Sequence, residues 1–564
     1  MTDSVSSTTS TTSTSSTSYS QNRNEFDTSS LVEAAVEEKL ARADTLETKV
    51  TDNETKIAAY QDLQDLLLTM QDSLEALRSD PSSTGKDDDV FLNRTAYLTS
   101  GTTTDADTLL AVTVEDGTDL GSHEVEITQV AKAERLGGGE QSSRSDDLGW
   151  SGSFSLGYTL DDTSASATID ITEDMSLDDI VDAINAESST TMVKASVITV
   201  SDGAYMIVLT GTQTAASIDL SDSDGSVLQD LGLIDSSGDK VDVLQEAQTA
   251  QLTIDGVDIE RNSNLIDDAI DGISLTLYKA EEGNTLTLEV DNSLSDIKEQ
   301  IQALVDAYNS FRDFVITNQA TADDGTADDS AVLFGDSTLR SISTSLQTAL
   351  TSAIDETSLA ALGITFDEDN KLELDEDTLD DALLNSLDDI QKLFAFTCTT
   401  SNGNLTMLRH GDSLQSADFT MDITVDSDGN VSAVSVDGDT SLFTISGSTI
   451  KGAEGSIYEG LSFVFTGSSS QSISVELSQG IADQMWQSVE TVADEYDGTL
   501  TDMISDLEDA NSDLEDRISD IETAAETYRE YLLEKYANIE AKLAEAQSVL
   551  DLLEALNNAE SSSS

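Results

Sequence analysis

LTDMISDLEDANSDLEDRISDIETAAETYREYL, residues 500–532, contains the repeat from which the architecture of this chain can be inferred. Its apolar or core-compatible residues recur at steps of four and three, the heptad spacing of a coiled-coil seam. We therefore predict a long helix from about Leu500 to Leu556, with one phase slip between Leu532 and Tyr536. The seam residues are Leu500, Ile504, Leu507, Asn511, Leu514, Ile518, Ile521, Ala525, Tyr528, Leu532, Tyr536, Ile539, Leu543, Ala546, Leu550 and Leu553.

A second seam of the same kind lies near the start of the chain, between about Leu31 and Asp80. Pro81 is expected to end this helix, because proline has no N–H and its ring blocks the preceding turn. Each seam carries one asparagine, Asn53 or Asn511, which is either a buried register device or a solvent-facing residue on a frayed turn. The seam residues are Leu46, Val50, Asn53, Ile57, Tyr60, Leu63, Leu67, Met70, Leu74 and Leu77.

Each predicted helix has an apolar stripe too narrow to make it stable alone. The simplest solution is that the two helices pair antiparallel, so that the chain ends lie together in a stalk about 75 Å long. The predicted fold is therefore multidomain α+β: a long antiparallel coiled-coil stalk formed by the N- and C-terminal helices, with β-rich head domains inserted between them.

The sequence between the two helices alternates mainly with the period of two that half-buried strands show, interrupted by short helices and turns. We predict residues 1–30 as a disordered segment and 31–85 as the N-terminal stalk helix. The remaining divisions are 86–135 plus 245–293 as a β-rich head domain, 136–244 as an inserted outer head domain, 294–401 as a helical and hairpin domain next to the stalk, 402–478 as an additional β lobe, and 479–564 as the C-terminal stalk helices.

An acidic stretch, ITFDEDNKLELDEDTLDDALL at residues 364–384, could suggest a calcium loop. An EF-hand loop starting at Asp367 would place Lys371 among the ligands and Leu372 where glycine makes the turn. A hairpin leading into a helix capped by Asp375 or Asp377 fits better. The DSDG at residues 426–429 is likewise interpreted as a turn between strands.

Composition excludes several classes of function. The chain has 564 residues with a net charge of −85, so it offers no basic footprint for nucleic acid or anionic membranes. Self-repulsion of this size opposes folding unless salt screens it, which predicts a saline habitat. The single cysteine, Cys398, permits no intramolecular disulfide and is expected to be a small buried side chain.

Targeting and catalytic signals are also missing from the sequence. No apolar run reaches about 18 residues, so no transmembrane helix is expected. The Ser/Thr-rich start lacks the apolar core of a cleaved signal peptide. No P-loop, nucleophile elbow or H-E-x-x-H motif is present, and His123 and His410 stand far apart. We predict no enzyme, no catalytic residues, no cofactor and no metal.

Several stretches, in order along nearly the whole chain, resemble the flagellar hook-associated protein 2 family of filament caps. The usual Gly-rich G-S-G-L-D before the first helix is replaced here by NRNEFD, so that only Asp27 matches. The stretches are DTSSLVEAAVEEKLARADTLETKV (27–50), GSHEVEITQVAKAERL (121–136), AQLTIDGVDIERNSNLIDDAIDGISLTLYKAEEGNTLTLEVDN (250–292), IKEQIQALVDAYNSF (297–311), GDSTLRSI (335–342), LGITFDEDNKLELDEDTLDDAL (362–383) and KYANIEAKLAEAQSVL (535–550).

This resemblance implies a secreted homo-oligomer, usually a pentamer, at the flagellar tip, where it promotes folding and polymerisation of flagellin. It implies that residues 1–30 are a type III export segment, and that hook–filament junction proteins and an export chaperone are further partners. The alternative is a surface adhesin or another type III-exported tip protein that binds glycans or a host surface. The residues predicted to form the stalk and to contact flagellin or other copies are Leu46, Val50, Asn53, Ile57, Tyr60, Leu63, Leu67, Met70, Leu500, Ile504, Leu507, Asn511, Leu514, Ile518, Ile521, Tyr528, Leu532, Tyr536, Ile539 and Leu543.

Overall fold

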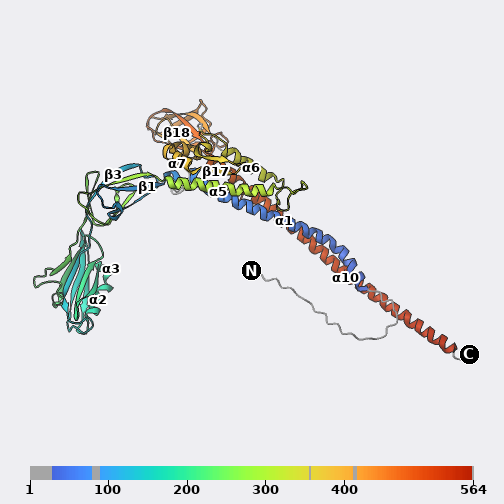
Figure 1. The fold of residues 1–564 in the computed structure, drawn as a ribbon, viewed down its shortest axis with the longest axis horizontal. Helices are drawn as coiled ribbons and strands as arrows, with labels where there is room; N and C mark the ends of the chain where they lie inside the picture. Colours follow the sequence, from blue (N-terminus) through green and yellow to red (C-terminus); the bar gives the residue numbers. More distant parts are fainter. Residues whose placement is uncertain (1–27, 79–88, 355–356, 411–415, 562–564) are drawn as a thin grey trace. The chain divides into compact units, whose positions relative to one another are not determined.

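The computed structural model describes residues 28–78, 89–354, 357–410 and 416–561 (Figure 1). It contains both helices and sheets, with several β-rich parts, as the sequence predicted. The chain divides into two compact units, one of residues 1–67, 314–340 and 490–564, the other of residues 68–313 and 341–489. None of the helices in the described ranges is both long enough and apolar enough for a membrane span.

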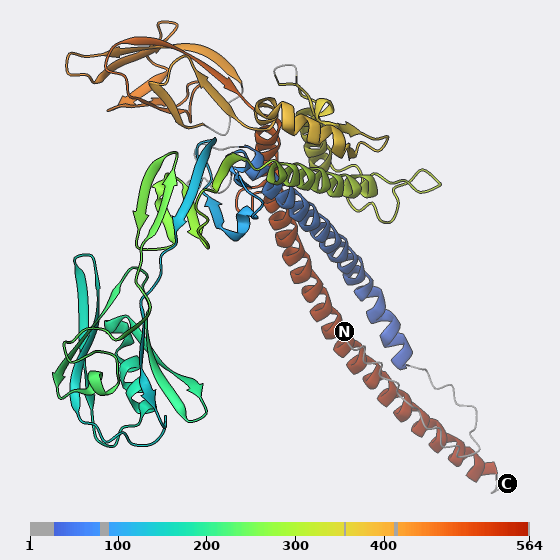
Figure 2. The same cartoon turned by 60° about the vertical axis from the view of Figure 1, so that its left-hand side comes forward.

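The first unit contains most of the two longest helices, α1 (Thr28–Arg78) and α10 (Thr499–Ser561). They lie side by side in both views, α1 in blue and α10 in red (Figures 1 and 2). Gln64 of α1 contacts Thr501 of α10, and Thr28 contacts Glu540, so the two helices run in opposite directions. The same unit holds the ends of α5 (Leu294–Asn318) and α9 (Ile481–Ala493) and the start of α6 (Ser337–Leu350).

The start of α1 corrects one prediction. Residues 28–30 were placed in a disordered segment, but they form the first turn of α1. A contact with a residue far away in the sequence explains why these residues are helical. The Thr28 hydroxyl donates to the Glu540 carboxylate, and Val32 is buried. The rest of the predicted disordered segment and the predicted helix end at Pro81 lie outside the described residues.

A first β-rich core lies in the second unit. Its apolar interior includes Val125, Leu252, Leu275 and Leu288. Five antiparallel strands form one sheet, in the order β1 (Arg94–Ser100), β15 (Thr285–Asn292), β3 (Gly121–Gln129), β11 (Ala250–Ile254) and β12 (Val257–Arg261). Three more form a second sheet, in the order β13 (Leu265–Ile270), β14 (Ile273–Leu277) and β2 (Leu110–Val114).

A second core is built from chain inserted between β3 and β11. The helix α2 (Leu177–Ala186) covers it and begins with a capping box between Ser176 and Asp179. A Cβ at Gly138 would lie 2.7 Å from the Leu231 carbonyl oxygen, so close backbone packing explains the glycine at this position. The strands are β10 (Asp242–Gln245), β4 (Arg135–Gln141), β8 (Ala204–Gly211) and β7 (Val193–Ser201) in one sheet, and β6 (Thr163–Ile171), β5 (Gly152–Leu160) and β9 (Ser217–Asp224) in the other. Short helices α3 (Ser188–Thr191) and α4 (Val227–Asp230) complete it.

A third core packs Phe419, Phe443 and Tyr458 together. Its first strand begins at Thr397, before the boundary at residue 402 that the sequence suggested. The Asp426 carboxylate accepts from the Asp428 and Asn430 amides, which confirms a turn between two strands. The sheets are β18 (Thr397–Thr400), β25 (Gln471–Ser478), β20 (Ala417–Val425) and β21 (Val431–Val436), and β19 (Leu405–Arg409), β24 (Ser462–Phe465), β23 (Thr449–Gly452) and β22 (Phe443–Ser446).

The acidic stretch forms the predicted hairpin, β16 (Ile364–Phe366) with β17 (Leu372–Leu374), followed by α7 (Glu376–Asn385) and α8 (Leu387–Phe394). Asp375 caps α7 by accepting from the Thr378 amide at 2.9 Å. Asn309 of α5 holds the hairpin through both its side-chain atoms, which bond the Leu372 main chain. In the turn, the Asp367 carboxylate accepts from the Asp369 and Lys371 amides, so these two carboxylates of the stretch serve as turn and cap.

Candidate functional site: the paired terminal helices

The surface where α1 and α10 meet carries most of the predicted contact residues. Met70 is buried but belongs to the second unit, whereas Ile539 and Leu543 are exposed near the end of α10. The buried ones of the first unit are Leu46, Tyr60, Leu63, Leu67, Leu500, Asn511 and Leu532. The half-buried ones are Val50, Asn53, Ile57, Ile504, Leu507, Leu514, Ile518, Ile521, Tyr528 and Tyr536.

The two seam asparagines meet each other. The Asn53 side-chain amide donates to the Asn511 side-chain oxygen at 2.8 Å, and Asn511 is only 8% exposed. Of the two interpretations that the sequence left open, the structure therefore favours the buried one. A shift of either helix by one heptad would place each asparagine against an apolar side chain and leave it unpaired, which is costly in a buried seam. The pair thus specifies one register.

Gln64 fixes the end of the helix pair next to the start of α10. Its side-chain amide donates to the Ala493 carbonyl and to the Thr501 hydroxyl, each at 3.0 Å. Thr501 in turn donates to the Asp494 carbonyl at 2.8 Å. Gln64 was not predicted as a site residue. Its position directly after the seam residue Leu63, where a polar side chain can reach across, was the available signal.

Tyr60 links the seam to a segment far away in the sequence. Its hydroxyl donates to Asp336 Oδ2 at 2.8 Å, while Asp336 Oδ1 accepts from the Leu339 amide in the first turn of α6. Burial raises the pKa of Tyr60 well above its ordinary value, and the bond to the Asp336 carboxylate raises it further. Sequence spacing placed Tyr60 in the seam but gave no indication of Asp336.

A cavity lies between α1 and α10 where small side chains face each other. An open cavity of about 470 Å³ is bordered by alanines and by three charged residues of α1. The Lys39 ammonium lies 4.6 Å from the centre of the Tyr528 ring, a cation–π contact. The lining residues are Ala35, Glu38, Lys39, Arg42, Ile521, Ala524, Ala525 and Tyr528. Alanines and charged side chains of this kind suit helix contacts and supply no nucleophile with an adjacent base.

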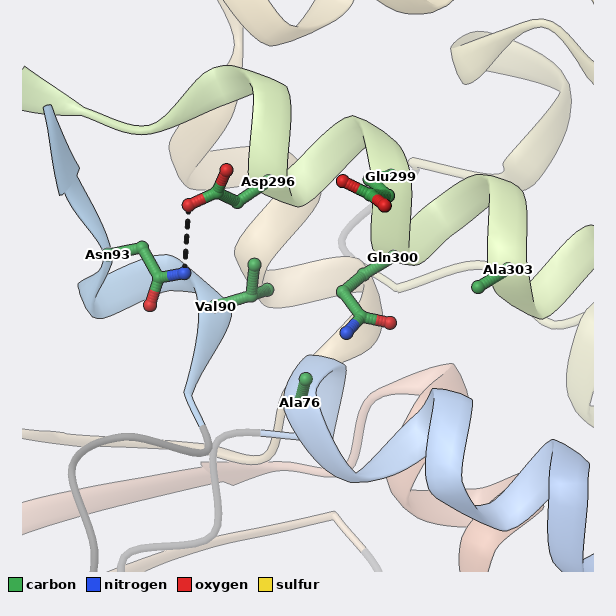
Figure 3. A pocket seen from close by; sticks show the side chains of 7 residues that line it. All are labelled: Ala76, Val90, Asn93, Asp296, Glu299, Gln300 and Ala303. Carbon is green, nitrogen blue, oxygen red and sulfur yellow. Dashed lines mark hydrogen bonds between the residues drawn. The ribbon is translucent and has the colours of Figure 1, made fainter.

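A second hollow, of about 420 Å³, lies in the second unit (Figure 3). Within it the Asn93 side-chain amide donates to Asp296 Oδ2 at 3.0 Å, and the Asn93 carbonyl accepts from the Ser293 amide. These bonds hold the chain before β1 against the start of α5. The lining residues are Ala76, Val90, Asn93, Asp296, Glu299, Gln300 and Ala303. Among the residues that the structure describes, no cluster of three histidine, cysteine or acidic side chains could hold a metal ion.

Buried charges gather around Asp483 of α9, also in the second unit. Asp483 Oδ2 accepts from the side chains of Gln479 and Gln487, at 2.8 and 3.0 Å. Its other oxygen lies 3.6 Å from Arg78 Nε and 3.9 Å from His410 Nε2. Sequence spacing had left His410 isolated. A buried carboxylate that lies between the Arg78 and His410 side chains ties together helix ends and strand ends, which is a structural role.

Comparison with known proteins identifies the family. The model of the flagellar hook-associated protein 2 C-terminus matches residues 247–548, and that of the N-terminus matches residues 24–134. A third model, the flagellin hook IN motif, matches residues 153–213.

Individual relatives carry the same name. The B-type flagellar hook-associated protein 2 of Pseudomonas aeruginosa is 30% identical over 121 residues, which cover 20% of this chain and 25% of that protein. The polar flagellar hook-associated protein 2 of Vibrio parahaemolyticus is 34% identical over 130 residues, covering 22% of this chain and 19% of that protein. This chain thus spans a quarter or less of the length of these curated relatives.

A solved structure of the flagellar cap protein FliD from Escherichia coli, comprising its D1-D2-D3 domains, is 31% identical. It covers 59% of this chain and 88% of its own chain, with a TM-score of 0.44. The C-terminal family model alone matches more than half of this chain. The chain therefore belongs to the flagellar hook-associated protein 2 family.

Proposed function

We propose that this chain is a flagellar filament cap, a homo-oligomeric structural protein that promotes folding and polymerisation of exported flagellin at the filament tip. The observation that carries the proposal is membership of the family, whose C-terminal model extends over residues 247–548. The chain would act outside the cell, and its role requires no catalytic residue or cofactor. The comparisons give the alternative, a glycan-binding adhesin or another exported tip protein, no support.

The stalk is part of this proposal. We infer that α1 and α10 form an antiparallel coiled-coil stalk whose seam residues hold the helices together and contact flagellin or other copies. Contacts at four levels support it: Gln64 with Thr501, Asn53 with Asn511, Lys39 with Tyr528, and Thr28 with Glu540. A helix pair of this length would be a rigid arm, because each helix covers the apolar stripe of the other and so stabilises it.

The domain division and the remaining partners also belong to the proposal. Three separate apolar cores support head domains built from residues 86–135 with 245–293, from 136–244 and from 402–478. The helices and hairpin of 294–401 would adjoin the stalk. A pentameric ring, contact with hook–filament junction proteins, an export chaperone and an export signal near the start follow from the cap role.

Deletion of the gene tests the function directly. Without a cap, flagellin should leave the cell as soluble monomer and no filament should form, because incoming subunits have no protected place to fold. Electron microscopy and immunoblotting of the culture medium measure both effects. Re-expression of the intact chain should restore filaments, and so should a control chain with the exposed Leu384→Ala substitution. Normal filaments in the deletion strain would contradict the proposal.

A further inference from the structure

Four short stretches of the chain match the acceptor triplet for N-linked sugars, Asn-x-Ser/Thr with any residue except proline at x. The sugar is joined to the side-chain nitrogen of the asparagine, so this nitrogen must have open space around it in the folded product. A triplet of this kind also occurs by chance, and the structure decides which of the four has that space. The triplets begin at Asn53, Asn93, Asn404 and Asn430.

Three of these asparagines use their side-chain amide inside the fold. Asn53 donates to its partner in the helix seam at 2.8 Å, and Asn93 donates to Asp296 at 3.0 Å. Asn404 donates to Gln471 at 3.2 Å, and all three asparagines are half-buried. A sugar on any of these nitrogens would have to occupy space that the neighbouring element already fills. The folded chain therefore excludes a sugar at these three positions.

Asn430 differs, because it lies in the turn that joins β20 to β21. All five residues from Asp426 to Asn430 are exposed, and so is Ser432, which completes the triplet. A Cβ built on Gly429 would have no atom within 4 Å apart from those of its chain neighbours, so the space around the turn is open. The Asn430 side chain lies beside the Asp426 carboxylate, a contact at the surface that water can replace.

The main chain of this turn keeps its shape independently of the Asn430 side chain. Asp426 Oδ1 accepts from the main-chain amides of Asp428 and Asn430, at 2.9 and 3.0 Å. Gly429 has a φ of +87°, the left-handed conformation that glycine adopts without strain. β21 is also an end strand of its sheet, in the order β18, β25, β20, β21. A sugar on Asn430 Nδ2 would therefore leave the main-chain hydrogen bonds of the turn in place.

We propose that Asn430 is an N-glycosylation site, and that folded molecules carry a sugar there and at none of the other three triplets. The donor is a sugar activated by a phosphate leaving group. Its bond from C1 to the phosphate oxygen breaks, and a bond from C1 to Asn430 Nδ2 forms. The phosphate leaves with the electron pair of the broken bond, and the nitrogen loses one proton. Because the restriction lies in the folded product, it holds whether the sugar is attached before or after folding.

The sugar would mark one surface of the third β core as facing the medium. It is a bulky, hydrated group beside the exposed carboxylates of Asp426 and Asp428, and it would keep other protein chains from packing against this turn. The inference rests on the proposed function only for the location outside the cell. Deletion of the gene measures filament assembly, whereas the test below measures a covalent modification, so either result can fail without the other.

Mass spectrometry of the full chain purified from its native cells tests the proposal, because these cells contain any transferase that the chain meets. The intact mass should exceed the mass of the sequence by one or more sugar residues. Fragmentation of proteolytic peptides should place the sugar on Asn430, with Asn53, Asn93 and Asn404 unmodified. A wholly unmodified Asn430 in the native protein, or a sugar on any of the other three asparagines, overturns the proposal.

Variants expressed in the same cells identify the acceptor. Asn430→Gln and Ser432→Ala should each remove the added mass, because each breaks the triplet, whereas Ser432→Thr preserves the triplet and should retain the added mass. The matched control, Ser427→Ala, changes a serine of the same exposed turn outside the triplet and should also retain it. Circular dichroism should show the same secondary structure in all these chains. Added mass that persists in Asn430→Gln, or that Ser427→Ala removes, contradicts the assignment.

Discussion

Asn53 and Asn511 form the one polar pair that the sequence marked at the seam positions of both helices. Asn511→Ala should lower the free energy of unfolding by about 1–2 kcal/mol, because the Asn53 amide would lose its partner in a partly buried site. Asn53→Ala should cost a similar amount, and the double variant much less than the sum. Urea titration of the four chains measures this coupling, and strictly additive losses would show that the hydrogen bond contributes nothing.

Tyr60 gives the helix pair a sensitivity to alkaline pH. Its pKa in the folded chain is raised from 10.0, mainly by burial and then by Asp336, so the folded chain keeps this hydroxyl protonated when the unfolded chain ionises it. The stabilisation is therefore complete below about pH 10 and is lost as the pH rises above it. The gap in Tm between the unaltered chain and Tyr60→Phe should narrow from about pH 9 to about pH 11. A constant gap would contradict this assignment.

Cys398 is expected to be an unreactive thiol. It is half-buried beside the third β core, and this burial raises its pKa to about 11. The thiolate is the nucleophilic form, so little of it exists near neutral pH. Iodoacetamide at about pH 8 should label the native chain far more slowly than the urea-unfolded chain, as mass spectrometry would show. Equal labelling rates in the two states would mean that the thiol is open to solvent.

At the scale of single elements, Asp375 determines where α7 begins. Its carboxylate accepts from the Thr378 amide, and this backbone bond lowers the pKa of Asp375. Asp375→Ala should lower the urea midpoint of unfolding, whereas Asp377→Ala, two residues later and inside the first turn of α7, should lower it less. Because the folded pKa is depressed, the contribution of Asp375 should be present above about pH 4 and fade below it. Equal urea midpoints for the two variants would contradict the assignment of Asp375 as the helix cap.

Local patterns predicted the elements that depend on neighbours in the sequence. The heptad spacing from Leu500 and from Leu46 predicted two long helices, and alternation around Ile364 and Leu372 predicted a hairpin. Both rest on periodicity, which a single sequence displays. Strand order could not be derived in this way. That β1 pairs with β15 and β15 with β3 depends on residues well over a hundred positions apart meeting in one sheet.

Some residues of the candidate site were predicted from the sequence, and others were not, for the same reason. Spacing identified its apolar seam and the two asparagines, because these repeat with the helix. The bonds of Gln64 to Ala493 and of Tyr60 to Asp336 were not predicted, since each partner lies on another element with no periodic signal. The sequence also did not predict how far α1 extends along α10. This length determines which leucines near the end of α10 remain exposed.

On the scale of the whole molecule, charge is the dominant property. The chain carries 111 acidic and only 26 basic residues, so most carboxylates have no cationic partner available. Many of them lie exposed along α10, including Asp509, Asp513 and Asp516. Mutual repulsion among such charges destabilises the compact state, because unfolding lets them separate. Stability should therefore depend on ionic strength more than on any single contact.

Salt should raise the melting temperature of the chain. Between about 0.1 M and about 1 M NaCl the Debye length falls from about 10 Å to about 3 Å, which screens repulsion between neighbouring carboxylates on one helix face. Calorimetry across this range should show a steady rise in Tm, and Asp509→Asn with Asp513→Asn and Asp516→Asn should raise Tm most at low salt and least at high salt. Sucrose, which carries no charge, serves as the control, because it stabilises by exclusion from the surface and should act equally on both chains. A Tm that is indifferent to NaCl, or a variant whose advantage persists at high salt, would show that repulsion between these charges does not govern the stability of the fold.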